Sequence, residues 1–408
     1  MNIAITDLLR AVSTALDYVE AQVVGVTTYH GQRIAYLSAL TGKVFGLKGD
    51  ELVYLMAAAL LHDNALYEFF EGKEDVSANN WVEKELTEHC SKGEENVKGL
   101  PFYPQIEHAI LYHHERADGK GLFGKTSDEI PLFAKLIHIS DTLDIEFNLS
   151  EMSEEKYHKL IQYLEEQRDS CFDGECIDAF TRVISYDVLA CITGDNIKTA
   201  LDEIIPRQEW DMTGDELMKF SDIFARITDI KSEFTYEHSL GIARKAYAMA
   251  GYYNWGEDIA GQLYFTGALH DIGKLMIRSD ILEKPGKLTK EEFTEIQNHA
   301  MGTFQILSNV KGLEEITRWA SLHHEKLDGS GYPFGLTASE LGHKERLLAC
   351  LDIYQALVEK RPYKNGMPHA KAMEILEEMV DKGQLDGDIT ADINNYFGGI
   401  QIAPNSSV

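Results

Sequence analysis

ALHD at residues 268–271 and LHHEKLDGSGYPFG at 322–335 decide the fold of this chain, because both stretches occur a second time. LLHD stands at 60–63 and YHHERADGKGLFG at 112–124, so each stretch recurs about 210 residues earlier. Histidines and aspartates outside these stretches recur at nearly the same interval. Such a repeat predicts two copies of one domain rather than one large domain.

The length of the chain agrees with two copies. Its 408 residues exceed the roughly 100 to 200 residues of a typical domain. We place the boundary near Pro206, which gives an N-terminal domain at 1–205 and a C-terminal domain at 206–408. Domains of this size bury enough apolar surface to fold without a disulfide or metal staple.

Helical periodicity dominates the sequence. Apolar residues recur at helical spacing, with few breakers, in the stretches 8–24, 50–63 and 258–271. Alternation typical of strands is scarce, and the strongest loop signals are DGKGLFG and DGSGYPFG, one after each His-His pair. We therefore predict an all-α fold of two tandem helical bundles, joined by helices around 185–220.

Composition and charge exclude several classes of function. The chain is 44% hydrophobic and 26% charged, as in ordinary globular proteins, and its net charge is −29. That charge disfavours DNA, RNA and anionic membranes as partners, so an anionic substrate would need a local cation such as a bound metal. The apolar stretch at 52–61 is shorter than the ~20 residues of a membrane span. Five cysteines without a CxxC pair and a start without signal-peptide features predict a reduced, cytoplasmic protein.

The recurring histidines and aspartates indicate metal binding. A single histidine on an apolar helix is usually a core residue, but ten in register between two copies are not explained in that way. Imidazole binds divalent transition metals and an adjacent carboxylate can bridge two ions, so each copy suits a two-metal centre. A purely structural metal is the alternative, although structural zinc prefers cysteine. The candidate ligands are His30, His62, Asp63, His89, His113, His114 and Asp141 in the first copy, and His238, His270, Asp271, His299, His323, His324 and Asp352 in the second.

The second copy resembles the HD-GYP phosphodiesterases, a branch of the HD metal-dependent phosphohydrolases. The resemblance covers residues 215–400 and rests on ordered motifs, which are His238, HDIGK at 270–274, KPGKLT at 284–289, His299, HHEKLDGSGYP at 323–333, Asp352 and RPYK at 361–364. It implies a helical domain that holds two or three metal ions, often iron or manganese. It also implies hydrolysis of cyclic di-GMP to linear pGpG and then to GMP.

The same resemblance implies roles for individual residues. One ion would be held by His238, His270 and Asp352, and the other by His299, His323 and His324. Asp271 would bridge the two ions, and a hydroxide between them would be the nucleophile. Asp271 and Lys274 are thus the expected catalytic residues. The expected substrate contacts are Lys274, Arg361, Lys364, Gly331 and Tyr332.

Two positions depart from the family pattern. Trinuclear members carry a glutamate one helical turn before the first ligand histidine, where this chain has Phe234, so we expect two ions rather than three. Members also usually carry an aspartate three residues after the ligand aspartate, where this chain has Gln355. That change could alter base contacts and favour the mixed guanine-adenine cyclic dinucleotide over cyclic di-GMP.

The first copy resembles only the broader HD superfamily. It has HDNAL in place of HDIGK and GLF in place of GYP, and no RPYK follows Asp141. Three interpretations stay open for it: a metal-bound regulatory or dimerisation module, a phosphomonoesterase, or a metal-free relic. Two interpretations compete for the whole chain. One is a cyclic-dinucleotide phosphodiesterase, with a homodimer as a possible assembly, and the other is a signalling module that binds nucleotide without turnover.

Overall fold

The computed structural model describes residues 1–23, 25–70, 83–228, 233–282, 284, 286–360 and 366–399. Contacts between Cα atoms divide the chain into two compact units. The first unit is Ala4–Trp210, and the second combines Met1–Ile3 with Asp211–Val408. The sequence-based boundary at Pro206 stays a proposal for the domain limits.

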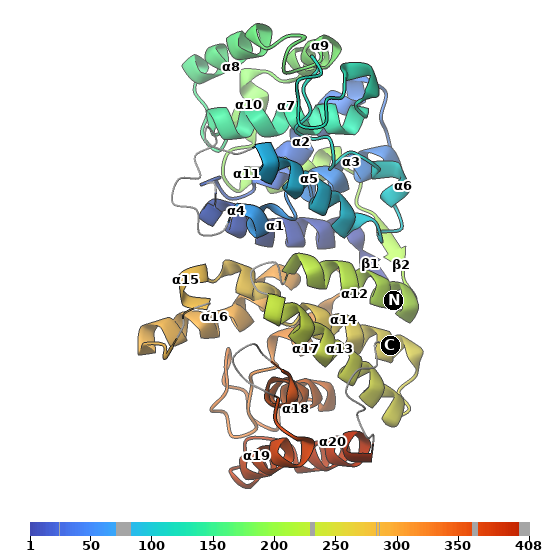
Figure 1. Cartoon of the computed structure of the whole chain (residues 1–408), viewed down its shortest axis with the longest axis vertical. Coiled ribbons are helices and arrows are strands. Elements are labelled where there is room, and N and C mark those ends of the chain that lie inside the picture. The colour runs from blue at the N-terminus through green and yellow to red at the C-terminus, as the bar shows by residue number, and fades with distance from the viewer. Residues whose placement is uncertain are drawn as a thin grey trace. The chain divides into compact units, whose positions relative to one another are not determined.

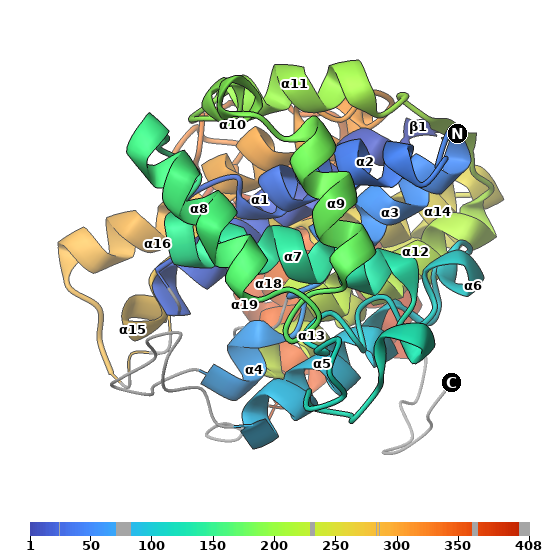
Figure 2. The same cartoon turned by 90° about the horizontal axis from the view of Figure 1, so that it is seen from above.

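The first unit is built from helices around α2, as Figures 1 and 2 show. Helix α2 packs against α1, α3, α7, α9 and α11. The helices of this unit are α1 (Ile5–Val23), α2 (His30–Val44), α3 (Asp50–Leu60), α4 (Leu66–Phe70), α5 (Glu83–Val97), α6 (Tyr103–Ile106), the 3-10 helix η2 (Ser127–Glu129), α7 (Leu132–Phe147), α8 (Glu154–Glu166), α9 (Gly174–Val183), α10 (Tyr186–Cys191) and α11 (Asn196–Ile204).

The second unit repeats the main helices of the first in the same order, with α12 matching α1 and α20 matching α9. Helix α13 packs against α12, α14 and α18, and α16 packs against η3 and α17. Its helices are α12 (Gly214–Thr228), α13 (Glu233–Tyr252), α14 (Glu257–Leu269), the 3-10 helix η3 (Ile272–Met276), α15 (Ser279–Leu282), α16 (Lys290–Leu307), α17 (Glu314–Ser321), α18 (His343–Val358), α19 (His369–Asp381) and α20 (Gly387–Gly399).

The predicted all-α fold is confirmed, and the helices coincide with the expected periodic stretches. Helices α1, α3 and α14 cover most of 8–24, 50–63 and 258–271. Two strands were not expected. β1 (Asn2–Ala4) pairs with β2 (Glu209–Asp211), and each has only three residues. Segments this short carry no readable alternation, which is why the sequence did not indicate them.

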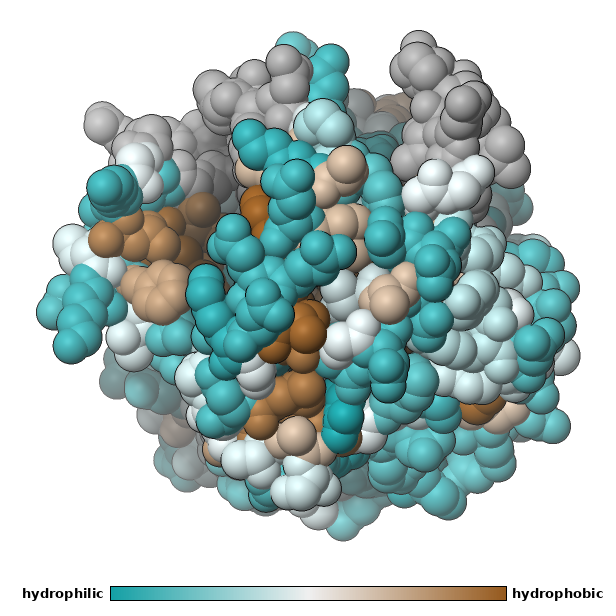
Figure 3. Space-filling view, turned by 90° about the horizontal axis from the view of Figure 1, so that it is seen from below, coloured by the Kyte–Doolittle hydropathy of each residue, from teal (hydrophilic) through white to brown (hydrophobic). Residues whose placement is uncertain are grey.

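The face of the molecule drawn in Figure 3 is mostly hydrophilic. Figure 3 shows one face on which hydrophobic residues form only small areas between hydrophilic ones. No helix in the described parts of the chain is long and apolar enough to cross a membrane. All five cysteines are free.

Candidate metal centres and substrate loop

Seven side chains of the second unit converge from five helices or from the turns that follow them. His238 lies on α13, His270 and Asp271 follow α14, and His299 lies on α16. The remaining three come from the turn after α17 and from α18. Potential ligand atoms come within 4.8 Å of one another in three overlapping groups, which are His238, His270 and Asp352; His270, Asp271 and His323; and His299, His323 and His324.

Asp271 stands between two parts of this cluster. Its Oδ2 lies 3.0 Å from His270 Nε2, and its Oδ1 lies 3.3 Å from His299 Nε2 and 3.8 Å from His323 Nε2. Burial alone would raise the pKa of this carboxyl, but His270 and Lys274 outweigh burial and hold the pKa well below its usual value. Asp271 is therefore an anion with one oxygen toward each half of the cluster.

Backbone carbonyls fix the orientation of the histidine rings. The Nδ1 of His270 contacts Gly267 O at 2.8 Å, and that of His299 contacts Ile296 O at 2.6 Å, in each case three residues earlier. His323 makes the same contact with Ala320 O. A ring that donates Nδ1–H to a carbonyl presents the lone pair of Nε2, here toward the cluster.

His238 is oriented by a carboxylate that the sequence analysis missed. Its Nε2 lies 3.1 Å from Asp352 Oδ1, and its Nδ1 lies 2.8 Å from Glu359 Oε2. Burial opposes charging of this ring, but Asp352 and Glu359 outweigh burial and raise the pKa of His238 to about 9. Glu359 follows α18 directly and lies outside every motif used above, so sequence alone gave no signal for it.

Gln355 belongs to the same buried network. Its Nε2 donates to Glu359 Oε2 at 3.1 Å, and its Oε1 accepts from Lys245 Nζ at 2.6 Å. The side chain is only 6% exposed. Gln355 therefore supports Glu359 rather than offering a free side chain for direct base contact.

Replacing Glu359 tests its positioning role. Glu359→Ala removes the acceptor for His238 Nδ1–H, so we expect metal affinity and turnover to fall about 10- to 100-fold, as for other partners of ligand histidines. Glu359→Gln keeps an amide oxygen that can accept this proton, and should recover much of both. Calorimetric titration with Mn²⁺ measures the affinity. Equal effects of the two changes would show that charge, not orientation, is what Glu359 provides.

Glu325, the residue directly after the His-His pair, holds the loop that follows the pair. Glu325 is 2% exposed, and its carboxylate accepts backbone N–H groups from Phe334, Gly335 and Leu336 at 2.7 to 3.1 Å. Charge-assisted bonds of this kind are the stronger class of hydrogen bond. In the first unit, Glu115 is likewise buried and accepts from the loop at 123–125.

Gly331 and Tyr332 place an aromatic ring beside the metal ligands. A Cβ at Gly331 would lie 2.4 Å from Lys326 N and 2.6 Å from His324 O, so only glycine fits there. Tyr332 N donates to His324 O at 3.2 Å, and the two ring centroids are 4.7 Å apart. The expected loop residues thus adjoin the cluster.

Lys274 also adjoins the cluster. The residue is on η3, and its ammonium group donates to Asp271 Oδ2. Arg361 and Lys364, the expected phosphate clamp, lie outside the described residues, and so does the side chain of Phe234. Their roles stay predictions.

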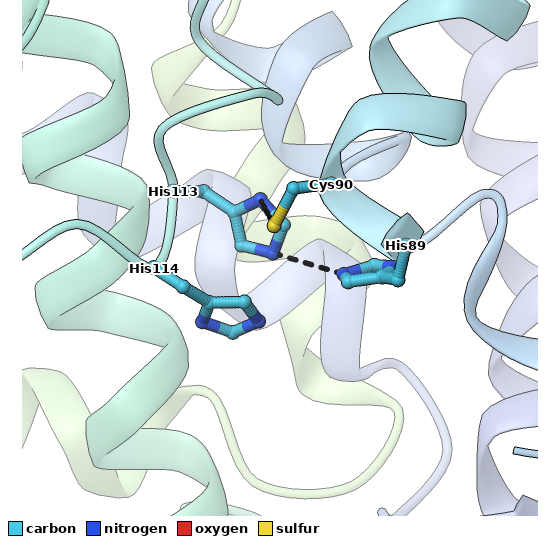
Figure 4. A group of neighbouring side chains, drawn as sticks. All are labelled: His89, Cys90, His113 and His114. Carbon is cyan, nitrogen blue, oxygen red and sulfur yellow. Dashed lines mark hydrogen bonds between the residues drawn. The ribbon is translucent and has the colours of Figure 1, made fainter. Parts of the chain in front are cut away.

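The first unit has a cluster of the same design. Asp63 Oδ1 lies 3.1 Å from His89 Nε2 and 3.4 Å from His113 Nε2, while Oδ2 lies 3.4 Å from His62 Nε2. His30 Nε2 lies 3.3 Å from Asp141 Oδ1. Figure 4 shows His89, His113 and His114 turned toward one another, with Cys90 beside His113. All seven candidate ligands of this copy therefore gather in one place.

Cys90 lies close to His89, His113 and His114, but its thiol does not point toward their inward-facing nitrogens. Its Sγ lies 3.9 Å from Nδ1 of His113, whereas Nε2 of that ring points to His89 and Asp63. The thiol is therefore behind His113 rather than among the inward nitrogens. In the second copy the corresponding residue is Ala300.

Both clusters fit divalent transition metal ions. Buried polar atoms normally find partners, yet several inward-facing atoms have no hydrogen bond. They are His270 Nε2 and Asp271 Oδ1 in the second unit, and His30 Nε2, His62 Nε2, Asp63 Oδ1 and Asp141 Oδ1 in the first. Imidazole nitrogens mixed with carboxylate oxygens are the donor set that such ions prefer.

The comparisons with known proteins agree with the repeat. A model of the HD domain family matches residues 23–176 and again residues 222–389. The chain is 28% identical over 400 residues to 3′3′-cGAMP-specific phosphodiesterase 1 of Vibrio cholerae, covering 95% of this chain and 90% of that protein. Over 147 residues it is 35% identical to a cyclic di-GMP phosphodiesterase of Pseudomonas aeruginosa, which is 36% of each chain.

A solved structure shares the fold. The cyclic GMP-AMP specific phosphodiesterase V-cGAP3 of V. cholerae superposes with a TM-score of 0.67 at 22% identity, over 98% of each chain. The match extends over both copies, as expected for a duplicated helical domain. Because the family model matches both halves at the motifs that form the two clusters, the chain belongs to the HD domain family.

Proposed function

We propose that the second unit hydrolyses the phosphodiester bonds of a cyclic dinucleotide. The main support is the position of Asp271, which lies between two groups of inward-facing histidines and accepts a hydrogen bond from Lys274. The named activities of the relatives in V. cholerae and P. aeruginosa support the same substrate class.

The residues of the site would have different roles in this reaction. Two divalent ions bound there would lower the pKa of a shared water from ~15.7 toward ~7. The first would be held by His238, His270 and Asp352, and the second by the three remaining histidines. Asp271 would be a ligand to both ions, and Lys274, which donates to Asp271, would offer its positive charge to a phosphate oxygen of the substrate. Tyr332 would pack beside the ligand His324, since the two ring centroids are 4.7 Å apart.

The choice of substrate is the finer part of the proposal. Cyclic di-GMP remains the principal candidate, and the mixed cyclic GMP-AMP is the alternative, which the name of the relative covering most of this chain favours. Purified full-length protein loaded with Mn²⁺ or Fe²⁺ is incubated with cyclic di-GMP, 3′3′-cGAMP and cyclic di-AMP, and the products are identified by mass spectrometry. Linear dinucleotides or mononucleotides from one substrate support the proposal. Binding of all three without any product would favour the signalling module.

Iron or manganese as the native metal, and a homodimer in solution, remain predictions from the sequence. For the first unit we propose a metal-bound regulatory or dimerisation module. Where the second copy has Lys274, the first has Leu66, which is buried in the core. An anionic phosphate at Asp63 would therefore meet no lysine at this position.

Arg361 tests the proposed phosphate clamp. Arg361→Ala should weaken transition-state binding by ~2.7 to 4 kcal/mol, the effect of losing one preorganised charge-stabilising group. Turnover would fall about 100- to 1000-fold while metal content stays constant. Steady-state kinetics and elemental analysis measure the two quantities. Loss of metal in this variant would mean that Arg361 supports the metal centre instead of the substrate.

A further inference from the structure

A chain of hydrogen bonds runs from Lys245 on α13 to the candidate ligand His238. Lys245 Nζ donates to Gln355 Oε1 at 2.6 Å, and Gln355 Nε2 donates to Glu359 Oε2 at 3.1 Å. The same oxygen of Glu359 lies 2.8 Å from His238 Nδ1. The side chains of His238 and Glu359 are 6% and 9% exposed, so water competes little for these bonds. Lys245 is thus connected to a ligand histidine through two other side chains.

The first unit holds its corresponding histidine with a different pair of residues. His30 Nδ1 lies 2.6 Å from Asp144 Oδ2. Arg33 Nε and Nη2 each donate to the carboxylate of Asp144 at 2.7 Å, and both residues are buried. A two-pronged contact between guanidinium and carboxylate fixes the position of the carboxylate. In this copy one carboxylate therefore orients the ligand histidine, and one buried cation holds that carboxylate.

Both charges stand one helical turn later in the second copy. Helix α13 matches α2 at an offset of 208, and α18 matches α7 at an offset of 211. The cation of position 33 would fall on Gly241, but the second copy has its lysine four residues later, at Lys245. The carboxylate of position 144 would fall on Gln355, and it too stands four residues later, at Glu359. Four residues are about one turn, so each charge stays on the same face of its helix.

The residues at the vacated positions complement each other. A Cβ at Gly241 would come within 2.8 Å of three atoms of the Gln355 side chain. Gln355 therefore occupies space that a larger residue at 241 would need, and it bridges the displaced cation and carboxylate. Where the second copy has its displaced lysine and glutamate, the first has Leu37 and Asn148. At these positions neither copy carries both arrangements.

The place of Lys245 is unfavourable for a charge. Burial lowers the pKa of Lys245 to about 8, although Glu359 raises it. The first copy has Leu37 at this position, which is fully buried and needs no hydrogen bond. A partly dehydrated ammonium group costs stability where an aliphatic side chain does not. Packing alone therefore does not account for the lysine.

We propose that Lys245 is a positioning residue of the candidate metal centre in the second unit, with the role that Arg33 has in the first. This inference rests on the proposed two-metal centre. Lys245 fixes the orientation of the Gln355 amide, so that the Nε2 group faces Glu359. Without the lysine, the amide would lose this orientation, and Glu359 would hold His238 less firmly.

Mn²⁺ binding to the full-length chain tests the assignment without a nucleotide. Loss of a positive charge by itself would strengthen the binding of a cation, whereas loss of positioning weakens it. We expect Lys245→Met to weaken one of the bound Mn²⁺ ions about 10-fold in calorimetric titration. That is the lower end of the range for partners of ligand histidines, because Lys245 acts through two side chains.

Arg244→Met is the matched control. It removes a cation from the neighbouring position of α13, where the side chain is exposed, and should leave Mn²⁺ binding unchanged. The first copy carries an apolar residue at the position of Lys245, so Lys245→Met is expected to fold, and circular dichroism checks this.

Two further backgrounds separate positioning from packing. In Glu359→Ala the lysine has no carboxylate to hold, so adding Lys245→Met should weaken Mn²⁺ binding no further. Gly241→Arg combined with Gln355→Asp gives the second copy the arrangement of the first, because the shorter aspartate frees the space at 241. In that background too, Lys245→Met should cause no further loss.

Three results would overturn the inference. The first is unchanged or stronger Mn²⁺ binding in folded Lys245→Met. The second is a full additional loss when this change is combined with Glu359→Ala, and the third is the same loss in the background with the arrangement of the first copy. Hydrolysis is measured separately. If Mn²⁺ binding changes as expected but the unmodified chain forms no product from any cyclic dinucleotide, the proposed function fails and the positioning role stands.

Discussion

Asp271→Ala is expected to abolish hydrolysis, whereas Asp63→Ala should leave most of it. Asp271 has one oxygen near His270 and the other near His299 and His323, so its removal separates the two groups that would hold the ions. It also leaves Lys274 without its carboxylate partner. Asp63 is the equivalent residue of the first unit, where no lysine follows and the proposed role is not catalytic. Product formation under saturating Mn²⁺ measures the difference.

The two variants are matched in chemistry and burial. Each removes a carboxylate less than 10% exposed from a cluster of histidines. A general loss of folding should therefore affect them alike, and circular dichroism identifies it. If both folded variants lost turnover equally, the assignment of the chemistry to the second unit would be wrong.

Gly331→Ala is expected to cost about 10⁴-fold in turnover. The added Cβ would stand 2.4 Å from Lys326 N and 2.6 Å from His324 O, both backbone atoms that cannot rotate away. The loop and the backbone of a ligand histidine must then separate, and Tyr332 moves with the loop. Misplacing one reacting group by about 1 Å costs about 100-fold, so two displaced groups cost about the product. We expect a stability loss of only about 1 to 3 kcal/mol, as for other overpacked sites.

Gly251→Ala is the matched control. Gly251 is a helical glycine near the end of α13, and a Cβ there meets no atom within 4 Å. It should keep full turnover and gain slightly in stability, because alanine favours helix more than glycine does. Kinetics and thermal unfolding of both variants separate the effects. A Gly331→Ala protein with near-normal turnover would remove the loop from the catalytic machinery.

The ligand clusters could be predicted from sequence because the repeat marks them. His62 and His270 stand in matching motifs, and a match over two copies distinguishes ligands from ordinary core histidines. Glu359 could not be found in that way, since it has no counterpart in a motif and reaches His238 only through the folding of α18 against α13. Asp144 did offer a signal, because DTLD at 141–144 places a second carboxylate three residues after a ligand.

The hydrogen bonds from ring nitrogens to carbonyls three residues earlier bear on how such a duplicated chain can evolve. Each of these rings is aimed by its own stretch of main chain, at His62 and His113 as well as at His270, His299 and His323. The orientation of these rings does not depend on a side chain from elsewhere in the sequence. After duplication, one copy could therefore lose its catalytic lysine and loop by drift while its preorganised nitrogens persisted. The orientation of the metal-binding histidines would therefore outlast the loss of the catalytic residues, and the site would stay available for another role.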